Sequence, residues 1–421
     1  MAQTATAGTS HAADLKELYS LPPVRALNDK SWIHDNIVKQ KATDVDFSGK
    51  YVRFPVTVRR ALGRGSRAES GDLPINIEEV EVEAKAYIKQ HYYALEWAET
   101  LELVSKNKEG AFESFVTKKM KNVGTDMAKD LNRQWFNPTV GRLALCTTND
   151  SAGLTFTVDN AQYIQVGDII DVCNSTTGAV ITAGKARLVT AVNRSTNVIT
   201  IDTNATVYAS ADSGNIDVAG TETVVLTGNY GNESEGLRAF ADTSRSLHGI
   251  DSSTYEEWNG NEINLSGTPV IGESSIERID DKVGRRGRGD VDVHLTTRGI
   301  RRRLADEFAA QRRYLNEKAT DIKAGYKIIE VNGVDTVIDD DCPEGYFFAG
   351  RTETLALLKL TEPGFLETEA GDGALIELKN GSVAGTKKAV FQAWYRYHVS
   401  LACTDPGGWG MITGGEDDTT E

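Results

Sequence analysis

Residues 51–74 read YVRFPVTVRRALGRGSRAESGDLP. From Tyr51 to Val58 apolar residues alternate with other residues, which is the period of a strand with one apolar face. A second alternation runs from Ile75 to Val82, with glutamates between the apolar positions. The glycine-rich segment between the two alternations is basic. Arg59 and Arg60 open it, and Arg64 and Arg67 lie within it. The sequence therefore predicts a two-stranded ribbon with a long basic tip over residues 48–83.

Such a ribbon cannot bury its own tip. Two strands alone are only marginally stable in water, and arginine side chains are rarely buried unless they are paired. We therefore expect the ribbon to lie on another copy of the same chain, where arginines meet carboxylates. The predicted inter-subunit contacts are Arg59, Arg60, Arg64 and Arg67, with the counter-charges Glu69, Glu78, Glu79, Glu81 and Glu83.

Composition narrows the class of protein. The 421 residues include 46 basic and 61 acidic side chains, a net charge of -15, which disfavours a protein that coats nucleic acid but not a shell that encloses it. The length predicts two or three domains of about 150 residues each. The start of the chain lacks the features of a signal peptide, and no apolar run is long enough to span a membrane. We expect synthesis in a cytosol and no membrane attachment.

The clearest helical pattern covers Lys108 to Phe136. Its apolar residues recur every three or four positions, which is the helical period, and Asn137-Pro138 ends it. A single apolar stripe on so long a helix predicts packing against a flat layer. Residues 1–47 ahead of the ribbon are predicted to form an extended N-terminal arm.

The composition changes at residues 146–226, which are rich in Thr, Val, Asp and Gly and show almost no helical period. Short alternating segments recur about every ten residues, which is typical of a small all-β barrel or sandwich. Because helical segments flank it, we expect a domain inserted into a host domain. The predicted strands are 154–159, 167–173, 186–192, 198–202 and 215–220.

Helices and strands mix in the remainder of the chain, so the overall class is α+β. The predicted elements are helices at Ser274–Val283 and Arg298–Tyr314, strands at Val291–Thr296, Gly345–Gly350 and Lys388–Leu401, and a hairpin at Tyr326–Ile338 with an Asn332-Gly333 turn. The last residues, from Gly415, are acidic.

Motifs for catalysis, metal binding or cofactors are absent from the sequence. The run Asp339–Asp341 is interpreted as part of a turn, because it lacks the spaced oxygens of a calcium loop. The four cysteines are widely separated and are predicted to be buried thiols. Glu256 and Glu257 beside Trp258 leave a weak hydrolase alternative, since sequence neighbours usually point apart.

Two further arginine clusters have two readings. Acidic residues flank them and no aromatic residue alternates with them, which disfavours a nucleic-acid patch and favours inter-subunit ion pairs or solvated faces. The secondary candidates for contact are Arg285, Arg286, Arg288, Arg301, Arg302 and Arg303.

The order of these elements resembles the major capsid proteins of tailed bacteriophages, whose fold is shared with herpesvirus shells and encapsulins. The resemblance covers about residues 20–413. It rests on Gly63-Arg64, Arg67, Glu69 and Leu73-Pro74 at the ribbon, the helix Glu109–Phe136, and the stretch from Ser274 through VDVHLT to YKIIEVNGVDTVIDDDCPEGYFFAG. The β-rich region lies outside the common core, although some members of the family carry such an insertion.

The resemblance implies a division into six segments. They are the N-terminal arm 1–47, the extended ribbon 48–83, a peripheral domain 84–145 with a spine helix, the insertion 146–226, an axial domain 227–385, and the return strand with an acidic tail, 386–421. It also implies pentamers and hexamers of the chain closing an icosahedral virion shell around double-stranded DNA without sequence-specific binding. Assembly would take place in the cytoplasm of a host bacterium, without cofactors and without enzymatic activity.

Two departures from the family pattern add expectations. Only about 47 residues precede the ribbon, so the scaffolding protein is expected to be a separate chain. A portal and a decoration protein are the other expected partners. No lysine occurs from Tyr51 to Val82, and arginine cannot replace lysine as the nucleophile of an isopeptide cross-link. We therefore expect a non-covalent shell. An encapsulin-like shell for protein cargo and a β-rich carbohydrate-binding or tail protein remain as alternatives.

Overall fold

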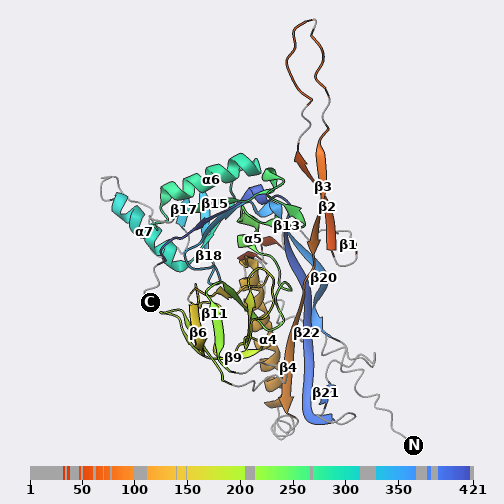
Figure 1. Cartoon of the computed structure of the whole chain (residues 1–421), viewed down its shortest axis with the longest axis vertical. Coiled ribbons are helices and arrows are strands. Elements are labelled where there is room, and N and C mark those ends of the chain that lie inside the picture. Colours follow the sequence, from red (N-terminus) through yellow and green to blue (C-terminus); the bar gives the residue numbers. More distant parts are fainter. Residues whose placement is uncertain are drawn as a thin grey trace, which may run out of the picture. The chain divides into compact units, whose positions relative to one another are not determined.

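The computed structural model describes residues 32–33, 36–37, 47–48, 51–59, 63–69, 71–75, 78–98, 111–138, 140–147, 149–203, 214–265, 269–312, 329–366, 377–380 and 387–417. The chain divides into two compact units (Figure 1). The first comprises Met1–Thr43, Ile88–Asn132 and Leu357–Ser400, and the second comprises Asp44–Tyr87, Arg133–Ala356 and Leu401–Glu421. The finer division into six segments stays a prediction.

The ribbon belongs to the second unit and consists of β1 (Phe47–Ser48), β2 (Tyr51–Arg59) and β3 (Val80–Tyr87). β2 and β3 are antiparallel, with Tyr51 opposite Tyr87 and Arg59 opposite Val80. The predicted first strand is confirmed. The second strand was predicted to run from Ile75 to Val82, which is wrong, because it begins at Val80 and continues to Tyr87. β2 ends at Arg59, after a bulge in its pairing with β3. Of the alternating residues ahead of Val80, Ile75, Glu78 and Glu79 are described outside any strand, so alternation without a partner does not make one.

Residues 144–226 form a β barrel in the second unit. Its six-stranded sheet has the order β5-β12-β8-β9-β10-β7. A bridge between Cys146 and Val158, with a hydrogen bond of 3.0 Å from Thr147 N to Thr157 O, joins the two outer strands and closes the barrel. The strands, including the separate pair β6 and β11, are β5 (Ala144–Leu145), β6 (Asn149–Gly153), β7 (Thr155–Thr157), β8 (Ile169–Asn174), β9 (Arg187–Asn193), β10 (Val198–Ile201), β11 (Ile216–Ala219) and β12 (Glu222–Leu226).

The predicted all-β character of this region is confirmed. Each of the five predicted strands overlaps an observed one, whereas β5, β6 and β12 were not predicted. The barrel is filled by fully buried aliphatic and aromatic side chains, among them Phe156, Ile170, Val172, Ile199 and Val224. Its interpretation as an inserted domain stays a prediction.

A mixed sheet with helices forms the rest of the second unit. Its strand order is β15-β23-β19-β16-β18-β17, with two parallel pairs, β15–β23 and β16–β18. The strands are β15 (Asn261–Asn264), β16 (Val293–Thr296), β17 (Ile329–Val331), β18 (Val334–Ile338), β19 (Phe347–Gly350) and β23 (Trp409–Thr413). The helices are α5 (Leu237–Ala241), α6 (Glu273–Gly287) and α7 (Arg298–Arg312), and the short elements are β13 (Ser246–Leu247), β14 (Ile250–Asp251), η1 (Glu256–Trp258), η2 (Thr352–Thr354) and η3 (Pro406–Gly408).

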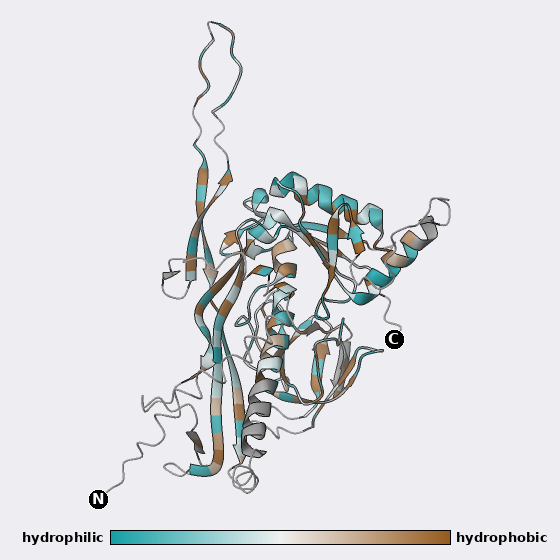
Figure 2. Cartoon of the chain, turned by 180° about the vertical axis from the view of Figure 1, so that it is seen from behind, coloured by the Kyte–Doolittle hydropathy of each residue, from teal (hydrophilic) through white to brown (hydrophobic). Residues whose placement is uncertain are grey.

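Helix α6 packs against the mixed sheet through its apolar residues. Its buried residues Ile276, Ile279 and Val283 recur at helical spacing, and Ile276 and Ile279 share a core with Ile300 of α7 and Phe347 of β19. In Figure 2 most of the α6 ribbon has the colour of hydrophilic residues, so the apolar residues of this helix are the minority that faces the core. The predicted helices, the strands at β16 and β19, and the Asn332-Gly333 hairpin turn are confirmed; Tyr314 and the first residues of the predicted hairpin lie outside the described residues.

The first unit is built on a long sheet and most of helix α4 (Ala111–Trp135). The sheet contains β4 (Gln90–Ala98), β20 (Leu355–Phe365), β21 (Glu377–Asn380) and β22 (Lys387–Cys403), and β22 pairs with the other three strands. The predicted helix and return strand are confirmed, although Lys108–Gly110 lie outside the described residues. The expectation of one apolar stripe is wrong for the end of α4, because Leu131 to Phe136 are all buried.

The structure also describes the four cysteines and the apolarity of the helices. All four cysteines are buried and unbonded to one another, as predicted. Burial raises the pKa of the Cys146 thiol to about 12 and that of Cys173 to about 11, so these thiols are unreactive. In the part of the chain that the structure describes, no helix has the length and apolarity needed to cross a bilayer.

Candidate assembly interface

The charged side chains of the ribbon are exposed. Arg59, Arg64, Arg67, Glu69, Glu78, Glu79, Glu81 and Glu83 all lie at the surface, and Arg60 lies outside the described residues. One ion pair joins the two strands, Arg53 to Glu83 at 3.1 Å, and sequence reasoning missed Arg53. Arg67 Nε donates a hydrogen bond of 2.7 Å to the backbone oxygen of Asp72 and so ties the tip to itself. Within the described residues no ion pair involves the other seven.

The tip also carries apolar side chains that sequence reasoning overlooked. Leu73 is 84% exposed and Ile75 is 85% exposed. The signal was present in the Leu73-Pro74-Ile75 sequence, which contains no charge. Isolated exposed apolar residues are common, but two close together in one projecting loop favour a contact surface. Figure 1 shows the described part of the tip extending away from the sheet of its own unit.

We call the paired part of the ribbon, β2 with β3, its root. The root contacts His248, which lies in the turn between β13 and β14. The backbone oxygen of His248 accepts a hydrogen bond of 2.8 Å from Lys85 N, and the imidazole packs edge-on against Phe54 at 5.9 Å. Its Nε2 accepts a hydrogen bond of 3.2 Å from Cys403 N, which requires the neutral ring. Burial lowers the pKa of His248 to about 4, although nearby Glu235 opposes the shift.

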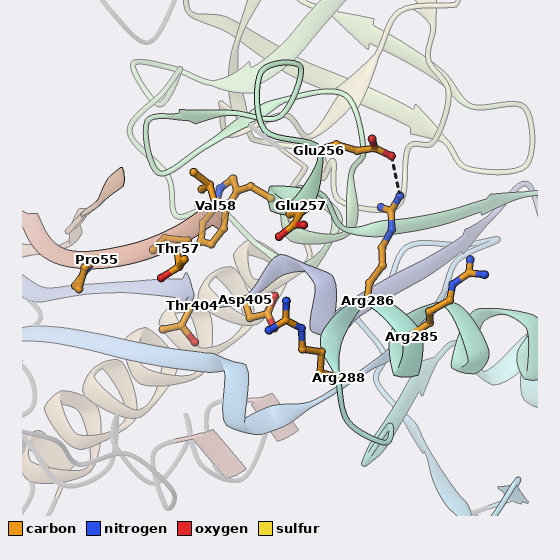
Figure 3. Close-up of a pocket in the computed structure, with 12 residues that line it drawn as sticks. Pro55, Thr57, Val58, Glu256, Glu257, Arg285, Arg286, Arg288, Thr404 and Asp405 are labelled. Carbon is orange, nitrogen blue, oxygen red and sulfur yellow. Dashed lines mark ion pairs between the residues drawn. The ribbon is translucent and has the colours of Figure 1, made fainter. Parts of the chain in front are cut away.

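A groove of about 620 Å³ lies beside the ribbon root (Figure 3). Its walls come from four segments far apart in the sequence: Pro55–Val58 of β2, Glu256–Trp258 of η1, the end of α6 and residues 404–405. Val58 and Trp258 are buried and Thr57 is exposed. The charged lining residues are Arg285, Arg286, Arg288, Glu256, Glu257 and Asp405.

The arginines of this groove differ in their partners. Arg286 donates a hydrogen bond of 2.9 Å to Gly260 O and lies 3.8 Å from the Glu256 carboxylate. Arg288 ends α6 in the left-handed conformation, with φ of 54°. The structure thus brings three of the six secondary candidates, Arg285, Arg286 and Arg288, to the root of the ribbon.

The other three secondary candidates lie on α7 and not in this groove. Arg303 forms an ion pair of 2.9 Å with Glu416, Arg302 is exposed and Arg301 is half-buried. The neighbouring Arg298 binds both oxygens of Asp340, at 2.5 and 2.9 Å. Asp341 N donates to the Asp339 carboxylate at 2.9 Å, so the predicted turn at Asp339–Asp341 is confirmed.

The arrangement of Glu256 and Glu257 does not favour the hydrolase alternative. Glu256 is 88% exposed and pairs with Arg286, and Figure 3 shows the Glu256 and Glu257 carboxylates pointing in different directions. Among the described residues, no three His, Cys, Asp or Glu side chains are grouped so that they could hold a metal ion. The exposed charges and apolar tip are instead suited to protein–protein contact.

In comparisons of sequence, no protein-family model and no curated protein matches the chain. Solved structures do match. A chain of the cyanophage A-1(L) capsid is 13% identical with a TM-score of 0.53, covering 88% of this chain and 90% of that one. A chain of Microbacterium phage Oxtober96 is 12% identical with a TM-score of 0.44, covering 88% of both chains. The encapsulin complex of Synechococcus elongatus is 8% identical with a TM-score of 0.40, covering 87% of this chain and 83% of that chain.

Of these three, the cyanophage capsid carries the argument, since its TM-score exceeds 0.5 and the match spans nearly the whole of both chains. The resemblance drawn from the order of the sequence elements is thereby confirmed at the level of fold. The chain has the major capsid fold of tailed bacteriophages.

Proposed function

We propose that the chain is the major capsid protein of a tailed bacteriophage, a structural protein of the virion shell rather than an enzyme. The observation that supports this most directly is the match to the cyanophage A-1(L) capsid over nearly the full length of both chains. In this proposal, pentamers and hexamers of the chain close an icosahedral shell around double-stranded DNA. The shell is assembled in the cytoplasm of the host bacterium.

The ribbon is the proposed element of contact between copies. Its exposed Arg59, Arg64 and Arg67 form no ion pair within the described residues, and its Leu73 and Ile75 side chains are largely exposed. A neighbouring copy could offer carboxylates to the first group and apolar surface to the second. Each such contact is weak alone, but a subunit makes several at once, and multivalency multiplies their effect. Charge complementarity then sets the register of neighbouring copies.

The proposed shell is non-covalent. The ribbon from Tyr51 to Val82 has no lysine that could form an isopeptide bond. Purified particles boiled in denaturant should therefore migrate as monomers on a gel. A ladder of multimers that survives this treatment would refute the non-covalent shell while leaving the capsid proposal intact.

Other parts of the chain receive roles by analogy with the fold. Residues 1–47 act as an N-terminal arm, 84–145 and 386–421 as the peripheral domain, 146–226 as an insertion, and 227–385 as the axial domain. A separate scaffolding protein, a portal and a decoration protein are the further proposed partners. The net charge of -15 disfavours tight binding of the inner wall to DNA during packaging.

Electron microscopy of the expressed chain tests the proposal. We expect closed isometric particles, formed by the chain alone or together with scaffolding protein from the same source. Phage particles carrying this chain should contain nuclease-protected DNA. A protein cargo in place of DNA would favour an encapsulin-like shell, and elongated trimers would favour a tail protein; either result would overturn the proposal.

A paired substitution tests the role of the ribbon tip. Arg64→Glu with Arg67→Glu should lower the yield of closed shells by about tenfold or more, because each lost contact is repeated in every subunit. Lys185→Glu with Arg194→Glu, on the exposed surface of the barrel, changes the net charge equally and serves as the control. Equal shell yields from both double variants would exclude the arginines of the tip as contacts.

A further inference from the structure

Two arginines at the end of α6 have no acidic partner of their own. Arg285 and Arg288 are exposed, and within the described residues neither side chain forms an ion pair or a hydrogen bond. Arg286 between them is already engaged by Glu256 and by Gly260 O. The wall of the groove therefore presents two guanidinium groups that are open to a ligand (Figure 3).

Within the described residues, the carboxylates of the same groove form no ion pair with Arg285 or Arg288. Glu256 faces Arg286, and Asp405 accepts a hydrogen bond of 3.1 Å from Gly407 N. Arg288 extends toward Asp405 in Figure 3 and lies outside ion-pair distance of it, although its charge opposes the rise that burial causes in the pKa of Asp405. Glu257 belongs to the wall formed by η1 and makes no ion pair within the described residues. The groove thus leaves guanidinium groups available, with strand backbone and hydroxyl groups beside them.

Unpaired carboxylates occur on the ribbon of the same chain. Glu78, Glu79 and Glu81 are exposed and, within the described residues, make no ion pair. They lie at the start of β3, where the paired part of the ribbon gives way to its projecting tip. Three adjacent carboxylates without counter-ions repel one another and favour a basic partner.

We propose that Arg285 and Arg288 bind the Glu78–Glu81 carboxylates of a neighbouring copy of the chain. This inference rests on the proposed function and names a second contact of the ribbon, separate from that of its tip. Each copy then offers one acidic patch and one basic patch at different places on its surface. Such a heterologous contact repeats from copy to copy and closes into a ring. Bidentate geometry between guanidinium and carboxylate fixes how far each ribbon advances over the next copy.

Two charge-reversed variants test the pairing. One is Arg285→Glu with Arg288→Glu, and the other is Glu79→Arg with Glu81→Arg. Each should assemble at about one tenth of the wild-type yield or less, because every subunit loses the contact. Circular dichroism and thermal unfolding of the free subunits check that both variants fold.

Mixing the two variants gives the decisive result. In a mixture, each variant meets a neighbour of opposite charge, so co-assembly should recover to within about threefold of wild type for six-membered rings, in which the variants can alternate. A mismatch remains in any five-membered ring, so sheets and hexamers should recover better than closed shells. The chain with all four substitutions should form closed shells, since all its contacts are reversed together.

Failure of the pairing between copies and failure of the proposed function give different results in these experiments. If wild type assembles but the mixture gains nothing over the single variants, the pairing between copies is wrong and the capsid proposal stands. Rescue in the fourfold variant without rescue in the mixture would place the pair within one chain and also overturn the inference. If wild type itself never assembles with its scaffolding protein, both the proposed function and this inference fail.

Discussion

The chain uses arginine in two opposite ways, in the barrel and in the ribbon. Arg187 of the barrel is fully buried; it forms an ion pair of 3.3 Å with Asp202 and donates to the backbone oxygens of Ala183 and Gly214 at 2.6 and 2.9 Å. Arg64 of the ribbon is exposed and has no ion pair within the described residues. A buried charge must be paired to be tolerated, whereas an exposed one costs nothing until a partner arrives. The barrel thus pairs its arginine within one chain, whereas we propose that the ribbon finds its partners on a second copy.

The largest effect on stability should come from breaking a buried pair. Arg133 and Glu233 form an ion pair of 2.9 Å with side chains only 8% and 2% exposed, and Asn137 and Asn229 also donate to Glu233. Glu233→Ala leaves the Arg133 charge buried without this partner and should lower the free energy of unfolding by about 3–5 kcal/mol. Denaturant unfolding of free subunits measures this. Glu79→Ala in the ribbon is the control and should leave the midpoint unchanged.

The root of the ribbon should be sensitive to acid. The folded pKa of His248, about 4, lies below its unfolded value of about 6.5, so the unfolded chain takes up the proton first as the pH falls. The contribution of His248 is therefore complete above pH 6.5 and is lost toward pH 4, by about 1.4 kcal/mol per pH unit at most. His248→Gln should flatten the pH dependence of stability in this window. An unchanged slope in the variant would assign the acid sensitivity to other groups.

The smallest effect is expected at the ion pair between the two ribbon strands. Arg53 and Glu83 are about half exposed, at 47% and 45%, and exposed pairs contribute little to stability. Arg53→Ala should leave the thermal midpoint of free subunits unchanged within error. A clear fall in that midpoint would mean that the ribbon, like the barrel, is stabilised by charges paired within its own chain.

Local patterns in the sequence were enough to predict β2, α4, α6 and the strands β7 to β11 of residues 144–226, since each follows a period that its own residues display. Contacts between distant residues were not accessible in this way. The pairing of β4 with β22 joins Gln90 to His398, and the groove joins Thr57 to Arg285; neither leaves a mark in local spacing. The start of β3 was misplaced for the same reason, because alternation at Ile75 says nothing about whether a partner strand is present.

Hydrogen exchange of the ribbon in free subunits and in assembled particles tests the central claim most directly. If neighbouring copies cover the ribbon, amides of residues 63–75 and 78–79 should exchange at least about tenfold more slowly in particles, while those of the barrel core change little. Equal exchange of the ribbon in both states would show that it stays uncovered after assembly, and would contradict the account.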